Sequence, residues 1–105
     1  MKIQRITYLS LGSNQGEKLE NLQKAIHLIA SEVGAIQKIA AIYKTPSWGF
    51  EGDEFLNTCI KVSTYQAPEK LLQSLLAIEK KLGRTRKGQN EYQNRPIDID
   101  VLLFD

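Results

Sequence analysis

Residues 3–34 read IQRITYLSLGSNQGEKLENLQKAIHLIASEVG, and they contain a strand pattern followed directly by a helix pattern. Residues 3–11 are rich in β-branched and other apolar side chains, which predicts a strand. Ser13 or Asn14 is expected to cap the helix, and Gly34 is expected to end it. Apolar residues at three- and four-residue steps predict the buried face of this helix: Leu19, Leu22, Ile26, Ile29 and Val33.

The rest of the chain contains three more strand patterns and one more helix pattern. Residues 35–44 and 55–64 predict the second and third strands, and residues 97–104 predict the last. The second helix is predicted to begin at Pro68 and to stop at Gly83. Its apolar stripe is expected to contain Leu71, Leu75, Ile78 and Leu82, broadened by Leu72 and Leu76.

The order strand, helix, strand, strand, helix, strand predicts an α+β fold of the ferredoxin-like type. We expect a mainly antiparallel four-stranded sheet with both helices on one face. The length favours a single domain over residues 1–105. Cys59 is the single cysteine, so no internal disulfide can form, which fits a cytoplasmic protein. The N-terminal region has the pattern of neither a signal peptide nor a membrane span, and we expect a monomer without a membrane partner.

The last predicted strand carries the strongest chemical signal, two aspartates separated by one residue. Alternate side chains of a strand share a face, so Asp98 and Asp100 are expected to project together, roughly 6.5 Å apart. Mg²⁺ takes oxygen ligands and often binds one or two carboxylates together with phosphate oxygens. On this triplet alone, the alternative is the polar outer face of an edge strand. The residues expected to face the core are Ile97, Ile99, Val101 and Leu103.

A cluster of basic residues precedes this strand. Within residues 80–95 the only acidic residue is Glu91, whereas the basic ones are Lys80, Lys81, Arg84, Arg86, Lys87 and Arg95. Phosphoryl transfer needs a metal and positive charge around the phosphates, which arginine supplies in bidentate form. From charge alone, a solvated helix end followed by a basic loop explains the cluster equally well. Glu79, at the border of the second helix's apolar stripe, is either a partly desolvated functional carboxylate or an ordinary boundary glutamate.

The third predicted strand suggests what the site binds. Phe55 and Asn57 should share the open face with Asp98 and Asp100. An aromatic ring beside an amide suits a flat heterocycle, although Phe55 could instead plug the loop above it. That loop, residues 45–54, is long and contains aromatic residues, which is typical of functional loops.

Several motifs along the chain resemble one family, the 6-hydroxymethyl-7,8-dihydropterin pyrophosphokinases of the folate pathway. The matching segments, which keep the family's order and nearly its spacing, are Leu9–Asn14, Tyr43–Pro46, Phe55–Asn57, Ile78–Glu79 with Gly83–Arg86, and Asn94–Phe104. The segment from Arg95 to Phe104 is the most specific of them. The resemblance implies a ferredoxin-like core and transfer of pyrophosphate from ATP to the hydroxymethyl group of the pterin.

The resemblance also implies roles for individual residues. Asp98 and Asp100 would bind two Mg²⁺ ions, and Arg84 and Arg95 would steady the phosphates during the reaction. Glu79 and Arg86 match positions on the nucleotide side. The pterin pocket would be lined by Thr45, Pro46, Trp48, Phe55 and Asn57.

Two departures from the family pattern qualify these expectations. Tyr92 stands where the family usually has a tryptophan, in a loop that is one residue longer. Family members also continue well beyond the aspartate strand, so we expect this chain to be the core without the C-terminal part, with weak or absent turnover. The alternatives are a pterin- or nucleotide-binding core without catalysis, a polymerase-like palm and a ferredoxin-like RNA-binding module. A palm would normally bring a third, distant carboxylate facing the same metals, and the first strand here offers none. The two aspartates would repel an RNA backbone, so no nucleic-acid partner is expected.

Overall fold

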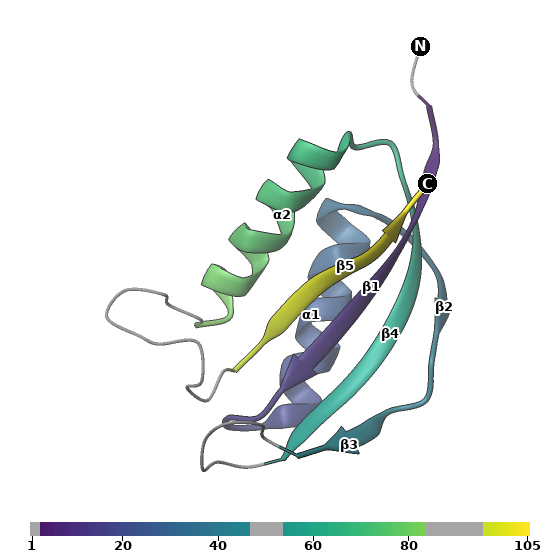
Figure 1. Cartoon of the computed structure of the whole chain (residues 1–105). Coiled ribbons are helices and arrows are strands. Elements are labelled where there is room, and N and C mark those ends of the chain that lie inside the picture. Colours follow the sequence, from purple (N-terminus) through teal and green to yellow (C-terminus); the bar gives the residue numbers. More distant parts are fainter. Residues whose placement is uncertain (1–2, 47–53, 84–95) are drawn as a thin grey trace.

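The computed structural model describes residues 3–46, 54–83 and 96–105. These described residues form two helices and five strands (Figure 1). Their bounds are β1 Arg5–Ser13, α1 Lys18–Glu32, β2 Gly34–Ile39, β3 Tyr43–Thr45, β4 Phe55–Thr64, α2 Pro68–Lys81 and β5 Asp98–Phe104. Within the described ranges, neither helix is long and apolar enough to cross a membrane.

The strands form one antiparallel sheet in the order β2-β4-β1-β5, and β3 pairs with the start of β4. β1 therefore has a neighbour on each side, whereas β5 lies at the edge. Both helices cover the same face of this sheet (Figure 1). This arrangement confirms the predicted α+β, ferredoxin-like fold.

The predicted strand count of four was wrong, because the strand expected over residues 35–44 is divided into β2 and β3. The register of β2 against β4 shifts between Ile36 and Lys38, and regular pairing stops after Ile39. The Ala40 N–H still donates to the Cys59 carbonyl at 2.8 Å, and the Thr58 hydroxyl donates to the Ala40 carbonyl at 2.8 Å. These bonds satisfy the backbone groups of Ala40, which lies between β2 and β3. β3 then pairs with the first residues of β4, Phe55 to Asn57.

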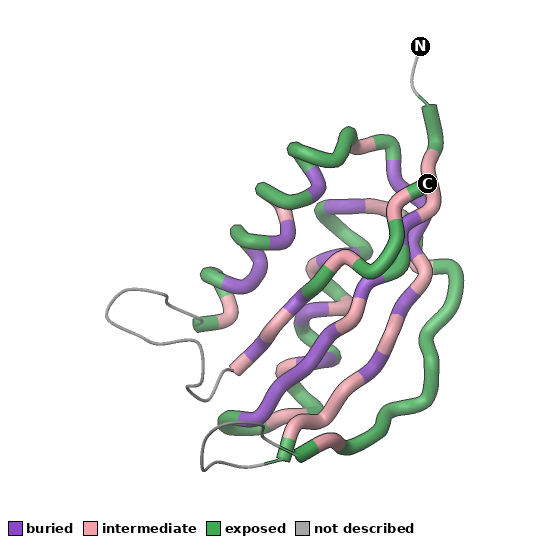
Figure 2. The backbone as a smooth tube through the Cα atoms, in the orientation of Figure 1, coloured by how far each residue is buried: buried purple, intermediate pink, exposed green. Residues whose placement is uncertain are grey.

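The hydrophobic core lies between the helices and the sheet (Figure 2). From the sheet it contains Leu9, Leu11, Ile60, Val62, Ile97 and Ile99, and from the helices Leu22, Ala25, Ile29, Leu71, Leu75 and Ile78. Burying one leucine or isoleucine side chain contributes about 1.5–3 kcal/mol, so this layer dominates the stability of the domain. Three leucines expected in the stripes are instead about half exposed, namely Leu19, Leu72 and Leu76. They lie at the borders of the stripes, where the helix surface turns away from the sheet.

A second correction concerns the end of β5, where Leu103 was expected to face the core but is 64% exposed. The pairing of β1 with β5 shifts between Tyr8 and Leu9, which leaves one extra residue, Leu102, in β5. An extra residue reverses the alternation of side chains beyond it. Phe104 consequently packs against the core in place of Leu103.

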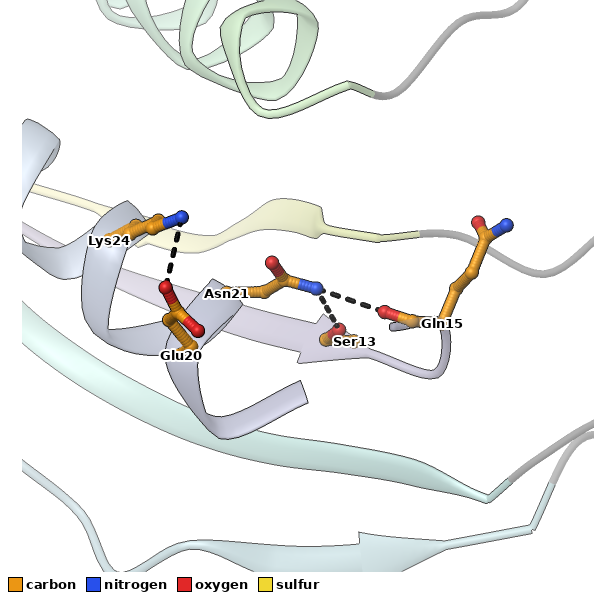
Figure 3. A network of polar contacts seen from close by, with 5 residues as sticks. All are labelled: Ser13, Gln15, Glu20, Asn21 and Lys24. Carbon is orange, nitrogen blue, oxygen red and sulfur yellow. Dashed lines mark hydrogen bonds and ion pairs between the residues drawn. The ribbon is translucent and has the colours of Figure 1, made fainter. Parts of the chain in front are cut away.

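The turn from β1 into α1 differs from the capping prediction, since the N-cap position is Glu17 and has no side-chain cap. Ser13 still belongs to β1, and its hydroxyl accepts a hydrogen bond from the Asn21 side chain at 3.2 Å (Figure 3). The same Asn21 amide donates to the Gln15 carbonyl at 2.9 Å. Gly16, with φ of +72°, supplies the left-handed conformation that the turn requires.

Candidate active site

The candidate site lies on the open face of the sheet, where β1 ends and β4 and β5 begin. Gly12 of β1 pairs with Asn57 on one side and with Asp98 on the other. One step along β1, Ser10 pairs with Cys59 and with Asp100. Neighbouring strands are separated by about 4.8 Å, so Asp98 and Asn57 lie roughly 10 Å apart across β1.

The burial pattern of β5 places the two aspartates on the face away from the helices. Ile97 and Ile99 are buried in the core, whereas Asp98 is half-buried and Asp100 is exposed. Directly paired residues of an antiparallel sheet share a face, so the aspartates also share the face of Gly12 and Asn57. The sequence-predicted grouping of Phe55, Asn57 and the aspartates is therefore what the sheet provides.

Asn57 is held in one orientation by hydrogen bonds from its amide nitrogen. Its Nδ2 donates to the Thr45 hydroxyl at 2.9 Å, and lies 3.4 Å from the carbonyl oxygens of Tyr43 and Phe55. With Nδ2 committed to these acceptors, the oxygen Oδ1 points across the sheet toward β1. The side chain of Asn57 thus presents an acceptor to the site.

Gly12 leaves the space into which Asn57 and Phe55 fit. A Cβ atom at this position would lie 2.9 Å from Asn57 Oδ1 and 3.3 Å from Phe55 Cδ1. The first distance is too short for a real contact, and the φ angle of Gly12 is not positive, so the requirement is one of space alone. Gly12 therefore forms the floor between the aspartates and the aromatic side of the site. The sequence suggested it only as part of the matching motif at residues 9–14.

Tyr43 and Cys59 form a pair beside Asn57 that the sequence analysis did not assign to the site. Tyr43 pairs with Asn57 through β3, and Cys59 follows Asn57 on the same face of β4. Burial raises the pKa of the Tyr43 phenol, and the neighbouring Cys59 thiol raises this pKa further. The raised pKa keeps the phenol a hydrogen-bond donor to a higher pH than an ordinary tyrosine.

Glu79 is buried, with 3% of its surface exposed, which excludes the solvated boundary glutamate as an interpretation. Its Oε2 accepts a hydrogen bond from the backbone N–H of Ile99 at 2.8 Å. Ile99 lies between Asp98 and Asp100, so this bond connects α2 to the strand that carries the aspartates.

The carboxylates of Asp98 and Asp100 fit a hard divalent cation that also binds phosphate oxygens of a substrate. Within the described ranges no three His, Cys, Asp or Glu side chains are grouped closely enough to form a metal site. Asp98 and Asp100 can therefore contribute two carboxylates, which suits Mg²⁺ when phosphate oxygens and water complete its coordination. Trp48, Arg84, Arg86, Tyr92 and Arg95 lie outside the described residues, so their predicted roles stay predictions.

Comparison with known proteins identifies the family. The sequence profile of 7,8-dihydro-6-hydroxymethylpterin-pyrophosphokinase matches residues 8–105. This chain belongs to that family. The matched range includes Gly12, Asn57, Asp98 and Asp100 of the candidate site, and it agrees with the resemblance found from the sequence motifs.

Curated relatives of the chain include pyrophosphokinases from several bacteria. A 2-amino-4-hydroxy-6-hydroxymethyldihydropteridine pyrophosphokinase of Porphyromonas gingivalis is 41% identical over 93% of this chain and 68% of its own length. The enzyme of the same name from Aquifex aeolicus is 40% identical over 92% of this chain and 59% of its own length. The enzyme of Bacillus subtilis is 36% identical over 94% of this chain and 59% of its own length. The chain thus spans 59 to 68% of these relatives, and the family reaction is pyrophosphoryl transfer to a hydroxymethyldihydropterin.

Proposed function

We propose that this chain binds ATP and 6-hydroxymethyl-7,8-dihydropterin on the open face of its sheet and transfers pyrophosphate to the pterin with the help of Mg²⁺. The observation that carries the proposal is the row formed by Asp98, Gly12 and Asn57 across three adjacent strands. This row supports the proposal because a carboxylate that could bind a metal–nucleotide complex and an amide that could bind a flat heterocycle share one face of the sheet.

The pterin would lie on the β4 side of this row. Phe55 offers its ring for stacking, and Asn57 Oδ1 offers an acceptor for an N–H group of the pterin. Thr45 is half-buried and Pro46 is exposed at the end of β3, where both can border the ring. We assign Trp48 to the same pocket on the family resemblance.

The triphosphate of ATP would lie on the β5 side. Asp98 and Asp100 would hold two Mg²⁺ ions, which supply positive charge to the phosphate oxygens when bound. Arg84, Arg86 and Arg95 are assigned to the phosphates and the nucleotide on the family resemblance. Transfer would need little covalent work from the protein, because positioning and charge stabilisation provide most of the catalysis of phosphoryl transfer.

Binding is the direct test of the proposal, because the chain spans only part of its relatives' length. Calorimetry with Mg²⁺, a non-hydrolysable ATP analogue and hydroxymethylpterin should detect binding of both ligands by the unmodified chain. Asp98→Ala and Asp100→Ala should each abolish the metal-dependent nucleotide signal, whereas Asp105→Ala, in the exposed residue after β5, should leave it unchanged. Unaltered metal–nucleotide affinity in either site variant would overturn the assignment of the metal pair.

Turnover separates an active enzyme from a binding core. Formation of AMP that depends on the pterin would establish pyrophosphoryl transfer by this chain. Binding of both ligands without AMP formation would instead support a pterin- and nucleotide-binding core.

A further inference from the structure

Glu79 lies where a charged side chain is costly. Among the described residues it is the one charged side chain that is buried, and its neighbours on the same face of α2 are Leu75 and Ile78. A buried carboxylate needs hydrogen bonds to offset its lost hydration. An apolar side chain would fill this position of the core at lower cost, so the carboxylate requires an explanation in terms of what it contacts.

One of its hydrogen bonds is with the backbone of the strand that carries the aspartates. Glu79 Oε2 lies 2.8 Å from the backbone nitrogen of Ile99, within the ordinary range of a charge-assisted hydrogen bond. The bond joins residues that are 20 positions apart, and it reaches the middle of the Asp98–Asp100 pair. The Ile99 side chain is buried beneath it, so the residue is held both by its backbone and by its side chain.

The position of β5 explains why such a bond matters. β5 is the edge strand, with β1 as its ladder partner on one side and no strand on the other within the described part of the sheet. An edge strand has backbone groups without ladder partners and is less constrained than a central strand. Glu79 supplies an acceptor for one of these groups from α2. The bond therefore restrains the outer side of β5 at the residue between the two carboxylates.

We propose that Glu79 is a positioning residue that fixes the spacing and direction of Asp98 and Asp100 through the Ile99 amide. It acts through the backbone of β5 and does not itself hold the metal. The inference rests on the proposed function, because it takes Asp98 and Asp100 as the metal ligands. Outer-shell groups that orient metal ligands typically change metal affinity by about 10- to 100-fold when they are lost.

Two substitutions separate position from charge. Glu79→Gln keeps an acceptor oxygen at the same distance from the backbone and removes the charge. Glu79→Asp keeps the charge and withdraws the oxygens by one methylene from the Ile99 N–H. Positioning predicts that Mn²⁺, used alone as an electron paramagnetic probe of the metal pair, binds Glu79→Gln within about 3-fold of the unmodified chain and Glu79→Asp about 10-fold more weakly. The opposite order, or equal affinity in the two variants, would overturn the inference.

Controls distinguish this inference from the proposed function itself. Glu69→Gln and Glu69→Asp, in the exposed first turn of α2, should leave Mn²⁺ affinity unchanged. Asp98→Ala and Asp100→Ala should abolish Mn²⁺ binding. If they do not, the metal pair of the proposed function fails; if they do and the Glu79 variants bind alike, only the positioning role fails.

A readout without metal keeps the test decisive if a Glu79 variant does not fold. Hydrogen exchange followed by NMR on the unmodified, metal-free chain should show the Ile99 amide among the slowest of β5, in spite of its edge position. Rapid exchange of this amide would overturn the inference. In a folded Glu79→Asp variant the same amide should exchange faster by at least about 10-fold, while the amides of β4 keep their rates.

Discussion

β4 and β5 lie on either side of β1, and each carries one half of the candidate site in a different way. The β4 half is held by a local network, in which Asn57 bonds to Thr45 and to backbone carbonyls while Gly12 leaves room for it. The β5 half depends on a contact from a distant helix, the bond from Ile99 to Glu79. The half proposed for the heterocycle is thus preformed by its own strands, whereas the half proposed for the metal is held from outside the sheet.

The largest effect is expected on the free energy of unfolding, from a change in β1, the strand that pairs with both β4 and β5. Leu11 of β1 is fully buried and pairs with both β4 and β5. Leu11→Ala should lower the free energy of unfolding by about 2–5 kcal/mol, because it leaves a cavity in the core. Urea denaturation should show this loss, and Leu102→Ala, at a residue that is 55% exposed, should change stability by less than about 0.5 kcal/mol. Similar losses in both variants would contradict the position of the core.

A change at Gly12 should separate the two halves. The new methyl group in Gly12→Ala would collide with Asn57 Oδ1 and press on Phe55, but its nearest contacts do not include the aspartates. Displacing a hydrogen-bonded amide costs about 1–3 kcal/mol, so pterin affinity should fall by about 5- to 150-fold. Mn²⁺ affinity should stay within about 2-fold.

Ser10→Ala is the matched control for Gly12→Ala, because Ser10 lies one step along the same face of β1 and pairs with Cys59 and Asp100. It should leave pterin affinity nearly unchanged. A parallel loss of metal and pterin binding in Gly12→Ala would show that the halves are coupled through β1 and are not independent.

A smaller effect should follow from releasing Asn57 while its space is kept. Thr45→Val removes the hydroxyl that accepts from Asn57 Nδ2 at 2.9 Å and nearly preserves the side-chain volume. One lost hydrogen bond of this kind costs about 0.5–1.5 kcal/mol, which corresponds to roughly 3- to 10-fold weaker pterin binding by calorimetry. Thr45→Ser keeps the hydroxyl and should bind as the unmodified chain does. Equal losses in the two variants would instead assign the effect to the methyl group.

The sequence predicted most of the fold, and it predicted that Asp98 and Asp100 share one face of their strand, because both follow from side-chain periodicity. Alternation in residues 97–100 placed Asp98 and Asp100 opposite Ile97 and Ile99, as the burial of β5 shows. It failed where an extra residue interrupts the ladder, at Leu102 in β5 and in the gap between β2 and β3. A bulge depends on how two distant strands pair, which local patterns do not record.

Contacts between distant residues set the other limit of sequence prediction. The sequence placed Glu79 at the border of a stripe, and its burial depends on α2 packing beside β5. In the same way, Gly12 could be recognised as part of a motif, but the need for a glycine follows only from the closeness of Asn57.

The smallest expected effect is on the pKa of the Tyr43 phenol, in the β4 half of the site. The pKa of the Tyr43 phenol is raised first by burial and then by the Cys59 thiol, so the folded chain favours the protonated phenol. A raised pKa stabilises the fold at pH below the ordinary tyrosine pKa, about 10, and this contribution is lost as pH rises through that value and then through the higher pKa of the folded state.

Removing the thiol tests the smaller of the two causes. Cys59→Ala should lower the pKa of Tyr43 toward its ordinary value without reaching it, because burial remains. The difference in tyrosinate absorbance between each chain and its Tyr43→Phe counterpart isolates this one phenol during an alkaline titration. An unchanged Tyr43 titration in Cys59→Ala would show that the thiol does not act on the phenol. It would also remove Cys59 from the local network that distinguishes the β4 half from the β5 half.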